Sequence, residues 1–173
     1  AHGLAAALLA AYPVPLAPGA APNLSRGAEL YAQQCAACHG IEGQGDGPAA
    51  AGLTPSPTAF TDGERARQRS IFALYQVVTQ GIDGTPMQSY ASLPTGDRWA
   101  LAFHAGQFAF PDTDASEGER LWQADPSLHA VVPDLKTLVG TTPAALAARV
   151  GAPRADELMA FLRRQPQQVI QSS

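Results

Sequence analysis

Two cysteines and a histidine fall within five consecutive residues, Cys35-Ala36-Ala37-Cys38-His39, and the chain has no further cysteine. One turn of helix places the two thiols where they can reach the two vinyl groups along one side of a porphyrin and form thioether bonds. The next residue, His39, is then aimed at the iron. The C-x-x-C-H spacing therefore predicts one covalently attached haem c, with His39 as an axial ligand of its iron.

Other uses of this cysteine pair fit the sequence less well. A thioredoxin-like redox pair would follow a β-strand, whereas the residues before Cys35 have a helical pattern. A structural zinc site needs four ligands, but His104 and His129 stand alone in the sequence. A disulfide between Cys35 and Cys38 would close too small a loop to add much stability.

The chain holds two methionines that could complete the coordination of the iron. Met87 lies in a non-helical stretch 48 residues after His39, which is enough chain to pass one edge of a haem and return on its other face. Met159 lies in an amphipathic helical pattern and is expected in the core. Met87 is therefore predicted as the second axial ligand, with His104, His129 or an open position as alternatives. A thioether ligand would raise the reduction potential towards the range of electron carriers.

Several residues are candidates for the surroundings of this haem. The carbonyl of Pro48 is placed to accept a hydrogen bond from Nδ1 of His39 and so to orient the ring. The apolar candidates for the pocket walls are Leu53, Phe60, Ile71, Leu74 and Tyr75. The candidates for pairing with the haem propionates are Arg65, Arg67, Arg69 and Arg98, although arginines in polar stretches are more often solvated.

Helical periodicity predominates along the chain and predicts an all-α protein. Residues suited to begin helices are Ser25, Ser70, Thr95, Ser116 in a capping box with Glu119, and Thr142 before Pro143. A last helix is expected over 153–164, followed by a polar tail that frays. The apolar residues 4–16 resemble a signal-peptide core, but are more readily interpreted as a short helix over 4–11 that Pro13 and Pro15 end.

The composition excludes some classes of function. Hydrophobic residues make up 46% of the chain and charged residues 15%, which favours a packed core over disorder. The net charge is −4 and no basic run occurs, so nucleic acid is not an expected partner. The apolar N-terminal stretch is shorter than the ~20 residues that a membrane-spanning helix needs, and no transmembrane segment is predicted.

The order of these motifs over residues 24–108 resembles the class I cytochrome c family. The shared features are Gly27-x-x-Leu30-Tyr31, the C-x-x-C-H motif, Gly47-Pro48, Met87 and Trp99-x-Leu101. The resemblance implies the fold of that family over 24–110, preceded by an apolar helix and a Pro-rich linker over 1–23. One feature differs: the family usually has proline directly after the ligand methionine, whereas here Pro86 precedes it and Gln88 follows.

A narrower resemblance covers residues 45–103, together with parts of the flanking segments. This region is similar to the periplasmic cytochrome region fused to bacterial iron permeases of the oxidase-dependent iron transporter family. The resemblance implies a periplasmic cytochrome that accepts electrons as ferrous iron is oxidised and delivered to the membrane permease. The transmembrane part of such a permease is not in this sequence. The chain would then be a soluble region of a protein tethered to the inner membrane.

Residues 111–173 contain no haem motif and are expected to form a helical extension. Gly118-x-x-Leu121-Trp122 repeats the pattern of Gly27-x-x-Leu30-Tyr31, but Pro126 and His129 stand where the cysteines would be. The region is interpreted as a plain helical extension or as a degenerate, haem-free cytochrome-like half.

The residues favour an electron-transfer protein with redox proteins as partners over an enzyme, because His and Met ligation leaves no open position on the iron. The alternatives are a generic cytochrome subunit of a respiratory dehydrogenase or oxidase and a haem peroxidase-like enzyme with a displaceable methionine. A third possibility is an iron-handling module whose carboxylates are Asp112, Asp114, Glu117 and Glu119.

Overall fold

The computed structural model describes residues 16–171 as helices joined by loops, and no strand occurs among these residues. The all-α prediction is confirmed. The expected helix over 4–11 lies outside the described residues. The helices are α2 (Leu24–Gln34), α3 (Ala36–His39), α4 (Gly63–Arg67), α5 (Ile71–Gln80), α6 (Thr95–Ala105), α7 (Asp112–Ala124), α8 (Ser127–Val131), α9 (Leu135–Gly140), α10 (Pro143–Val150), α11 (Ala152–Arg164) and α12 (Gln168–Gln171).

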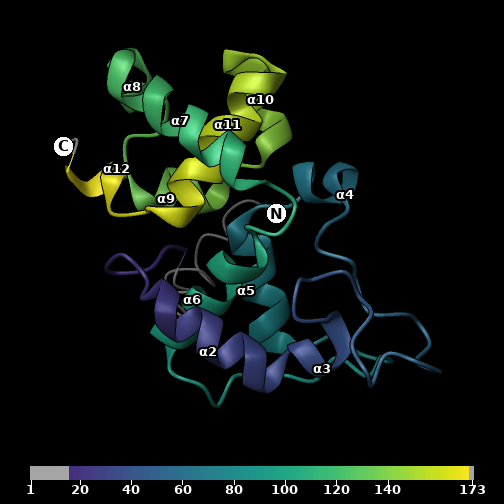
Figure 1. Cartoon of the computed structure of the whole chain (residues 1–173). Coiled ribbons are helices and arrows are strands. Elements are labelled where there is room, and N and C mark those ends of the chain that lie inside the picture. The colour runs from purple at the N-terminus through teal and green to yellow at the C-terminus, as the bar shows by residue number, and fades with distance from the viewer. Residues whose placement is uncertain (1–15, 172–173) are drawn as a thin grey trace, which may run out of the picture.

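Helices α2, α3, α5 and α6 form one group, at the bottom of Figure 1. Helix α2 packs against α6, and at their crossing Gly27 lies so close to Ala100 that a Cβ atom on the glycine would overlap the Ala100 carbonyl. Leu30 and Tyr31 on α2 and Leu101 on α6 are almost completely buried beside this crossing. This arrangement is consistent with the cytochrome c fold that the resemblance of residues 24–108 implies.

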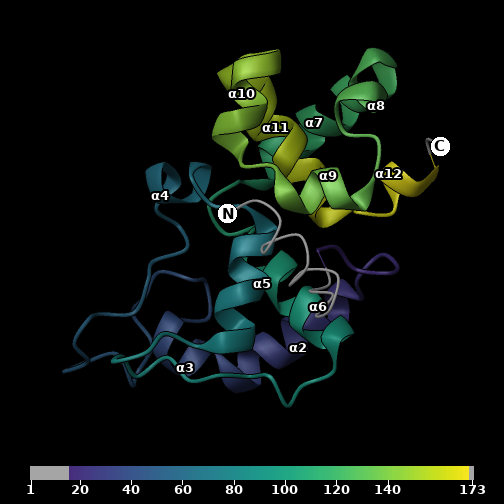
Figure 2. The same ribbon diagram turned by 180° about the vertical axis from the view of Figure 1, so that it is seen from behind.

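Helices α7 to α12 form a second group, above the first in Figure 1 and seen from behind in Figure 2. Here α7 packs against α11, and a Cβ atom on Gly118 would overlap the carbonyl of Glu157. Trp122, one turn further along α7, is buried. The repeated Gly-x-x-Leu-aromatic pattern therefore marks a second close helix crossing, as Gly27 marks the first.

One hydrophobic core runs through both groups. It joins Ile71 and Tyr75 of α5 and Trp99 of α6 to residues of the C-terminal helices such as Leu138 and Leu158. Helix α9 packs against α5, and α11 packs against α6. Residues beyond 110 therefore share their interior with the first group, while the division of the chain at this point stays a prediction.

Two of the predicted helix starts are confirmed. The hydroxyl of Ser70 accepts a hydrogen bond from the Ala73 N–H at 3.0 Å, and that of Thr142 accepts one from the Ala145 N–H at 3.0 Å. Both bonds satisfy an amide that has no partner within the first turn of its helix.

Other predicted boundaries are wrong. Asn23, not Ser25, caps α2 by accepting from the Arg26 N–H. Thr95 is the first residue of α6, and its cap is Pro94. Helix α7 begins before Ser116, whose hydroxyl donates to the carbonyl of Asp112 within that helix.

The expected fraying after residue 164 is also contradicted, because Val169 of α12 is completely buried in the shared core. An apolar contact outweighs the polar composition of this tail.

Candidate functional site

A cavity of about 710 Å³ opens between α3, the loop before α4, helix α5 and the loop that follows α5. Cys35, Cys38, His39 and Met87 all line it. The volume lies within the ~300–1,000 Å³ range of small-molecule and cofactor sites. The four residues that the sequence predicts to hold a haem thus face one space, although 48 residues separate the two axial candidates.

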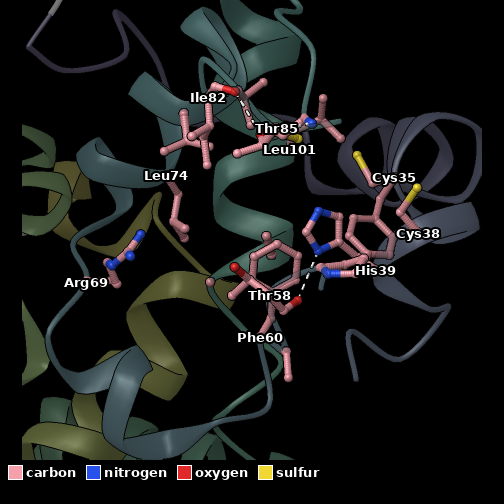
Figure 3. A pocket seen from close by; sticks show the side chains of 18 of the residues that line it. Cys35, Cys38, His39, Thr58, Phe60, Arg69, Leu74, Ile82, Thr85 and Leu101 are labelled. Carbon is pink, nitrogen blue, oxygen red and sulfur yellow. Dashed lines mark hydrogen bonds between the residues drawn. The ribbon is translucent and has the colours of Figure 1, made fainter. Parts of the chain in front are cut away.

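The local backbone presents both thiols and the histidine together. Helix α2 ends at Gln34, and α3 begins after Cys35. The His39 N–H donates to the Cys35 carbonyl at 2.9 Å, which closes the turn. Figure 3 shows Cys35, Cys38 and His39 side by side at one end of the cavity. Both cysteines are free thiols in this structure.

Burial and the neighbouring Cys38 raise the pKa of Cys35 to about 11. Cys35 is therefore protonated at neutral pH. A redox-active pair of the thioredoxin type relies on a cysteine pKa that is lowered instead. The raised pKa of Cys35 therefore argues against a redox-active cysteine pair of the thioredoxin type.

A backbone carbonyl orients the imidazole of His39. Its Nδ1 lies 3.0 Å from the carbonyl oxygen of Thr58, shown as a dashed line in Figure 3, and the ring stacks on Phe60 with centroids 4.6 Å apart. Since a carbonyl only accepts, Nδ1 must carry the hydrogen. This leaves Nε2 with a lone pair, as an axial metal ligand requires.

The prediction that the Pro48 carbonyl accepts from His39 is wrong. Pro48 is exposed and does not line the cavity. The amides of Gly47 and Ala49 bind the carbonyls of Cys38 and Ala37, which holds this part of the loop against α3 and away from the ring. The loop then turns back, and a bond from the Phe60 N–H to the Gly43 carbonyl, 2.7 Å long, brings Thr58 to the imidazole.

The loop after α5 holds Met87 through its own hydrogen bonds. The Ile82 N–H donates to the Met87 carbonyl at 3.0 Å, and the Thr85 hydroxyl both donates to the Ile82 carbonyl at 2.7 Å and accepts from the Met87 N–H at 3.2 Å. Ile82 and Thr85 lie across the cavity from Thr58 (Figure 3). Thr85 therefore fixes the backbone of Met87 although no proline follows the methionine.

Tyr90 ties this loop to the thiol end of the cavity. Its hydroxyl donates to the carbonyl of Gln34, directly before Cys35, at 3.0 Å, and its N–H donates to the Val78 carbonyl at 2.9 Å. Tyr90 lines the cavity as well. Nothing in the local sequence around Tyr90 signals this role, because its partner lies 56 positions away.

The predicted wall residues divide into two sets. Leu53, Phe60 and Leu74 line the cavity as predicted, whereas Ile71 and Tyr75 do not. Helix α5 lies between the cavity and the shared core, and Ile71 and Tyr75 are on its core side. There the Tyr75 ring stacks on Trp99 with the ring centroids 3.9 Å apart. A helical stripe alone does not distinguish core from cavity.

The four candidate arginines also divide. Arg65 and Arg69 line the cavity. Arg67 instead forms an ion pair with Asp156 of α11 at 2.8 Å, and Arg98 binds the hydroxyl of Thr79 at 2.8 Å and the Leu93 carbonyl at 3.1 Å.

The alternative ligands do not reach the site. His104 and His129 are absent from the cavity lining. The His104 ring packs on Tyr31 with the ring centroids 4.9 Å apart, and burial lowers the pKa of His104. Nε2 of His129 lies 3.1 Å from the Trp122 carbonyl oxygen. Within residues 16–171, no three His, Cys, Asp or Glu side chains gather as a metal site would require, and this holds for the carboxylates of α7.

The donor set and the walls fit a haem c. Two thiols and an imidazole with a free Nε2 stand at one end of an apolar cavity, and a thioether faces the same space from another loop. When bound there, a haem supplies a one-electron couple at its iron.

The family model described as cytochrome c oxidase, cbb3-type, subunit III matches residues 22–104. This match covers slightly less than half of the chain and supports a c-type cytochrome domain over these residues. No curated protein matches the sequence.

One similar solved structure is a chain of the Kuenenia stuttgartiensis reducing HAO-like protein complex Kustc0457/Kustc0458. It is 30% identical to this chain, with a TM-score of 0.47. The match covers 55% of this chain and 49% of that chain, so it spans about half of that chain's length. Among the described residues, this chain has no helix that is long and apolar enough to cross a bilayer.

Proposed function

We propose that this cytochrome carries single electrons on one haem c, attached through Cys35 and Cys38 and ligated by His39 and Met87. The observation that carries the proposal is that both axial candidates and both thiols line the same cavity. A saturated coordination sphere leaves no position for a substrate, which favours electron transfer over catalysis at the iron.

Several groups of the chain would maintain that state. The Thr58 carbonyl holds the proton on Nδ1 of His39 and so leaves the lone pair of Nε2 available to the iron. The hydroxyls of Thr85 and Tyr90 fix the loop that presents Met87. The apolar walls exclude water, so that little solvent must rearrange when the charge of the site changes.

Carbon monoxide distinguishes this carrier from a peroxidase-like enzyme with a displaceable methionine. Mixed with the dithionite-reduced holoprotein, carbon monoxide should leave the absorption spectrum unchanged over minutes, because Met87 occupies the sixth position. Rapid formation of a carbon monoxide spectrum would contradict a stable sixth ligand.

We further propose that the protein acts in the periplasm and accepts electrons released when ferrous iron is oxidised for a membrane iron permease. The support is the resemblance of residues 45–103 to cytochrome regions fused to such permeases. The match of residues 22–104 to the family model of an oxidase subunit supports the alternative, an electron carrier of a respiratory oxidase.

Stopped-flow mixing tests the iron link. Ferrous iron added to the oxidised holoprotein should produce the reduced spectrum within seconds, and ascorbate serves as a control for a haem that can be reduced. Reduction by ascorbate but not by ferrous iron would leave a carrier that serves other redox partners.

A further inference from the structure

Arg163, near the end of α11, is a buried cation whose hydrogen-bonding capacity is partly unused. The residue is 1% exposed. Nη1 donates to the Gly106 carbonyl at 2.9 Å and Nη2 to the Arg69 carbonyl at 3.1 Å, while Nε is buried without a partner. A guanidinium has five N–H donors, so three remain available.

No carboxylate among the described residues pairs with this guanidinium. Asp156, two turns earlier on α11, forms its ion pair with Arg67, and its charge offsets only part of the desolvation at Arg163. Desolvation lowers the pKa of Arg163 to about 10, so the side chain still carries its charge at neutral pH. A charge without a partner in the interior is strongly destabilising. The structure therefore has a buried positive charge that lacks an anion.

Arg163 lies in the wall of the cavity. Arg163 lines it together with Ala105, Gly106 and Arg69. Figure 3 shows Arg69 at the end of the cavity opposite Cys35 and Cys38. Because Nη2 of Arg163 binds the Arg69 carbonyl, the buried charge lies at that same end.

The chemistry of the porphyrin identifies the missing anion. Its two vinyl groups and its two propionates are on opposite edges of the ring. Thioether bonds to Cys35 and Cys38 would therefore direct the carboxylates of an attached haem towards Arg69 and Arg163. A guanidinium and a carboxylate form strong, charge-assisted hydrogen bonds.

We propose that Arg163 pairs with a haem propionate, so that a helix outside the cytochrome domain completes the haem pocket and raises the reduction potential. The inference rests on the haem of the proposed function. A positive charge near the haem disfavours the oxidised state, which carries one more positive charge than the reduced state. Arg163 is a positioning residue that acts on the iron through the propionate.

A purely structural role predicts a different result. The two bonds to Gly106 and Arg69 already join α11 to the ends of α6 and α5. If Arg163 were only this clamp, its loss would lower stability and leave the potential unchanged. The neighbouring Arg164 is a matched control: it bonds the Phe110 and Ala160 carbonyls and pairs with Asp112, but it does not line the cavity.

Spectroelectrochemical titration of the holoproteins separates the two roles. R163Q should shift the one-electron equilibrium about tenfold towards the oxidised form, which corresponds to a potential about 59 mV lower. R163K, which keeps the charge, should show less than half of this drop in potential, and R164Q should have the potential of the wild type. An unchanged potential in R163Q, or equal losses in R163Q and R163K, would overturn the proposal.

A second measurement covers the case in which R163Q does not fold. Resonance Raman spectra of the wild type, R163K and R164K report the bending band of the haem propionates. The band should shift in R163K alone, and its constancy in R163K or an equal shift in R164K would overturn the pairing. The intact mass of the wild-type protein tests the proposed function separately. A mass without covalently bound haem would contradict the proposed function, whatever the result for Arg163.

Discussion

At the scale of single residues, backbone carbonyls and side chains distant in sequence hold the residues around the proposed haem ligands in place. The Thr58 carbonyl orients His39, the Gln34 carbonyl receives the hydroxyl of Tyr90, and the Arg69 carbonyl receives Arg163. In each bond the acceptor is a main-chain oxygen. These three contacts therefore do not depend on which side chains occupy the acceptor positions.

The same contacts explain which site residues the sequence could predict. Cys35, Cys38 and His39 are adjacent, and their chemistry follows from spacing alone. Arg163 contacts residues 57 and 94 positions away, and its role depends on a helix outside the haem motif region. Pro48 was a plausible acceptor by its distance from His39 along the chain, but the path of the loop, set by glycine turns, presents Thr58 instead.

At the scale of elements, two glycines set how closely helices cross. Gly27→Ala should lower the free energy of unfolding by about 1–3 kcal/mol, because the added methyl group would push α2 from the Ala100 carbonyl. Gly118→Ala should cost a similar amount at the α7–α11 crossing. Urea unfolding followed by far-ultraviolet circular dichroism measures both.

Gly96 provides the matched control for these substitutions. It lies in the first turn of α6, and a Cβ atom there would meet no atom within 4 Å. Gly96→Ala should leave stability unchanged or raise it by up to about 1 kcal/mol. If Gly27→Ala and Gly118→Ala behaved like Gly96→Ala, the close crossings would be contradicted.

Helix existence was more predictable than helix ends. Ser70 and Thr142 cap helices as predicted because each stands directly before an apolar helical pattern. Ser116 with Glu119 has the spacing of a capping box, yet α7 starts at Asp112 after Pro111. The helix extends four residues before Ser116, as far as Asp112, and begins directly after Pro111. The local capping pattern therefore does not decide where this helix begins.

At the scale of the whole molecule, the C-terminal helices share one interior with the first group of helices. The core that holds Trp99 also holds Trp122 and continues to Val169. Composition and periodicity predict the all-α class, but they cannot show that two groups of helices share one core, since this depends on contacts between distant segments. The predicted extension thus supports α5 and α6, which carry part of the cavity wall.

The absorption spectrum of the oxidised holoprotein tests the central claim, a haem held by His39 and Met87. The wild type should show the sulfur–iron charge-transfer band, and Met87→Ala should lose it. Met159→Leu should keep the band, because Met159 is completely buried in the core and does not line the cavity. A band that persists in Met87→Ala, or that disappears only in Met159→Leu, would contradict ligation by Met87.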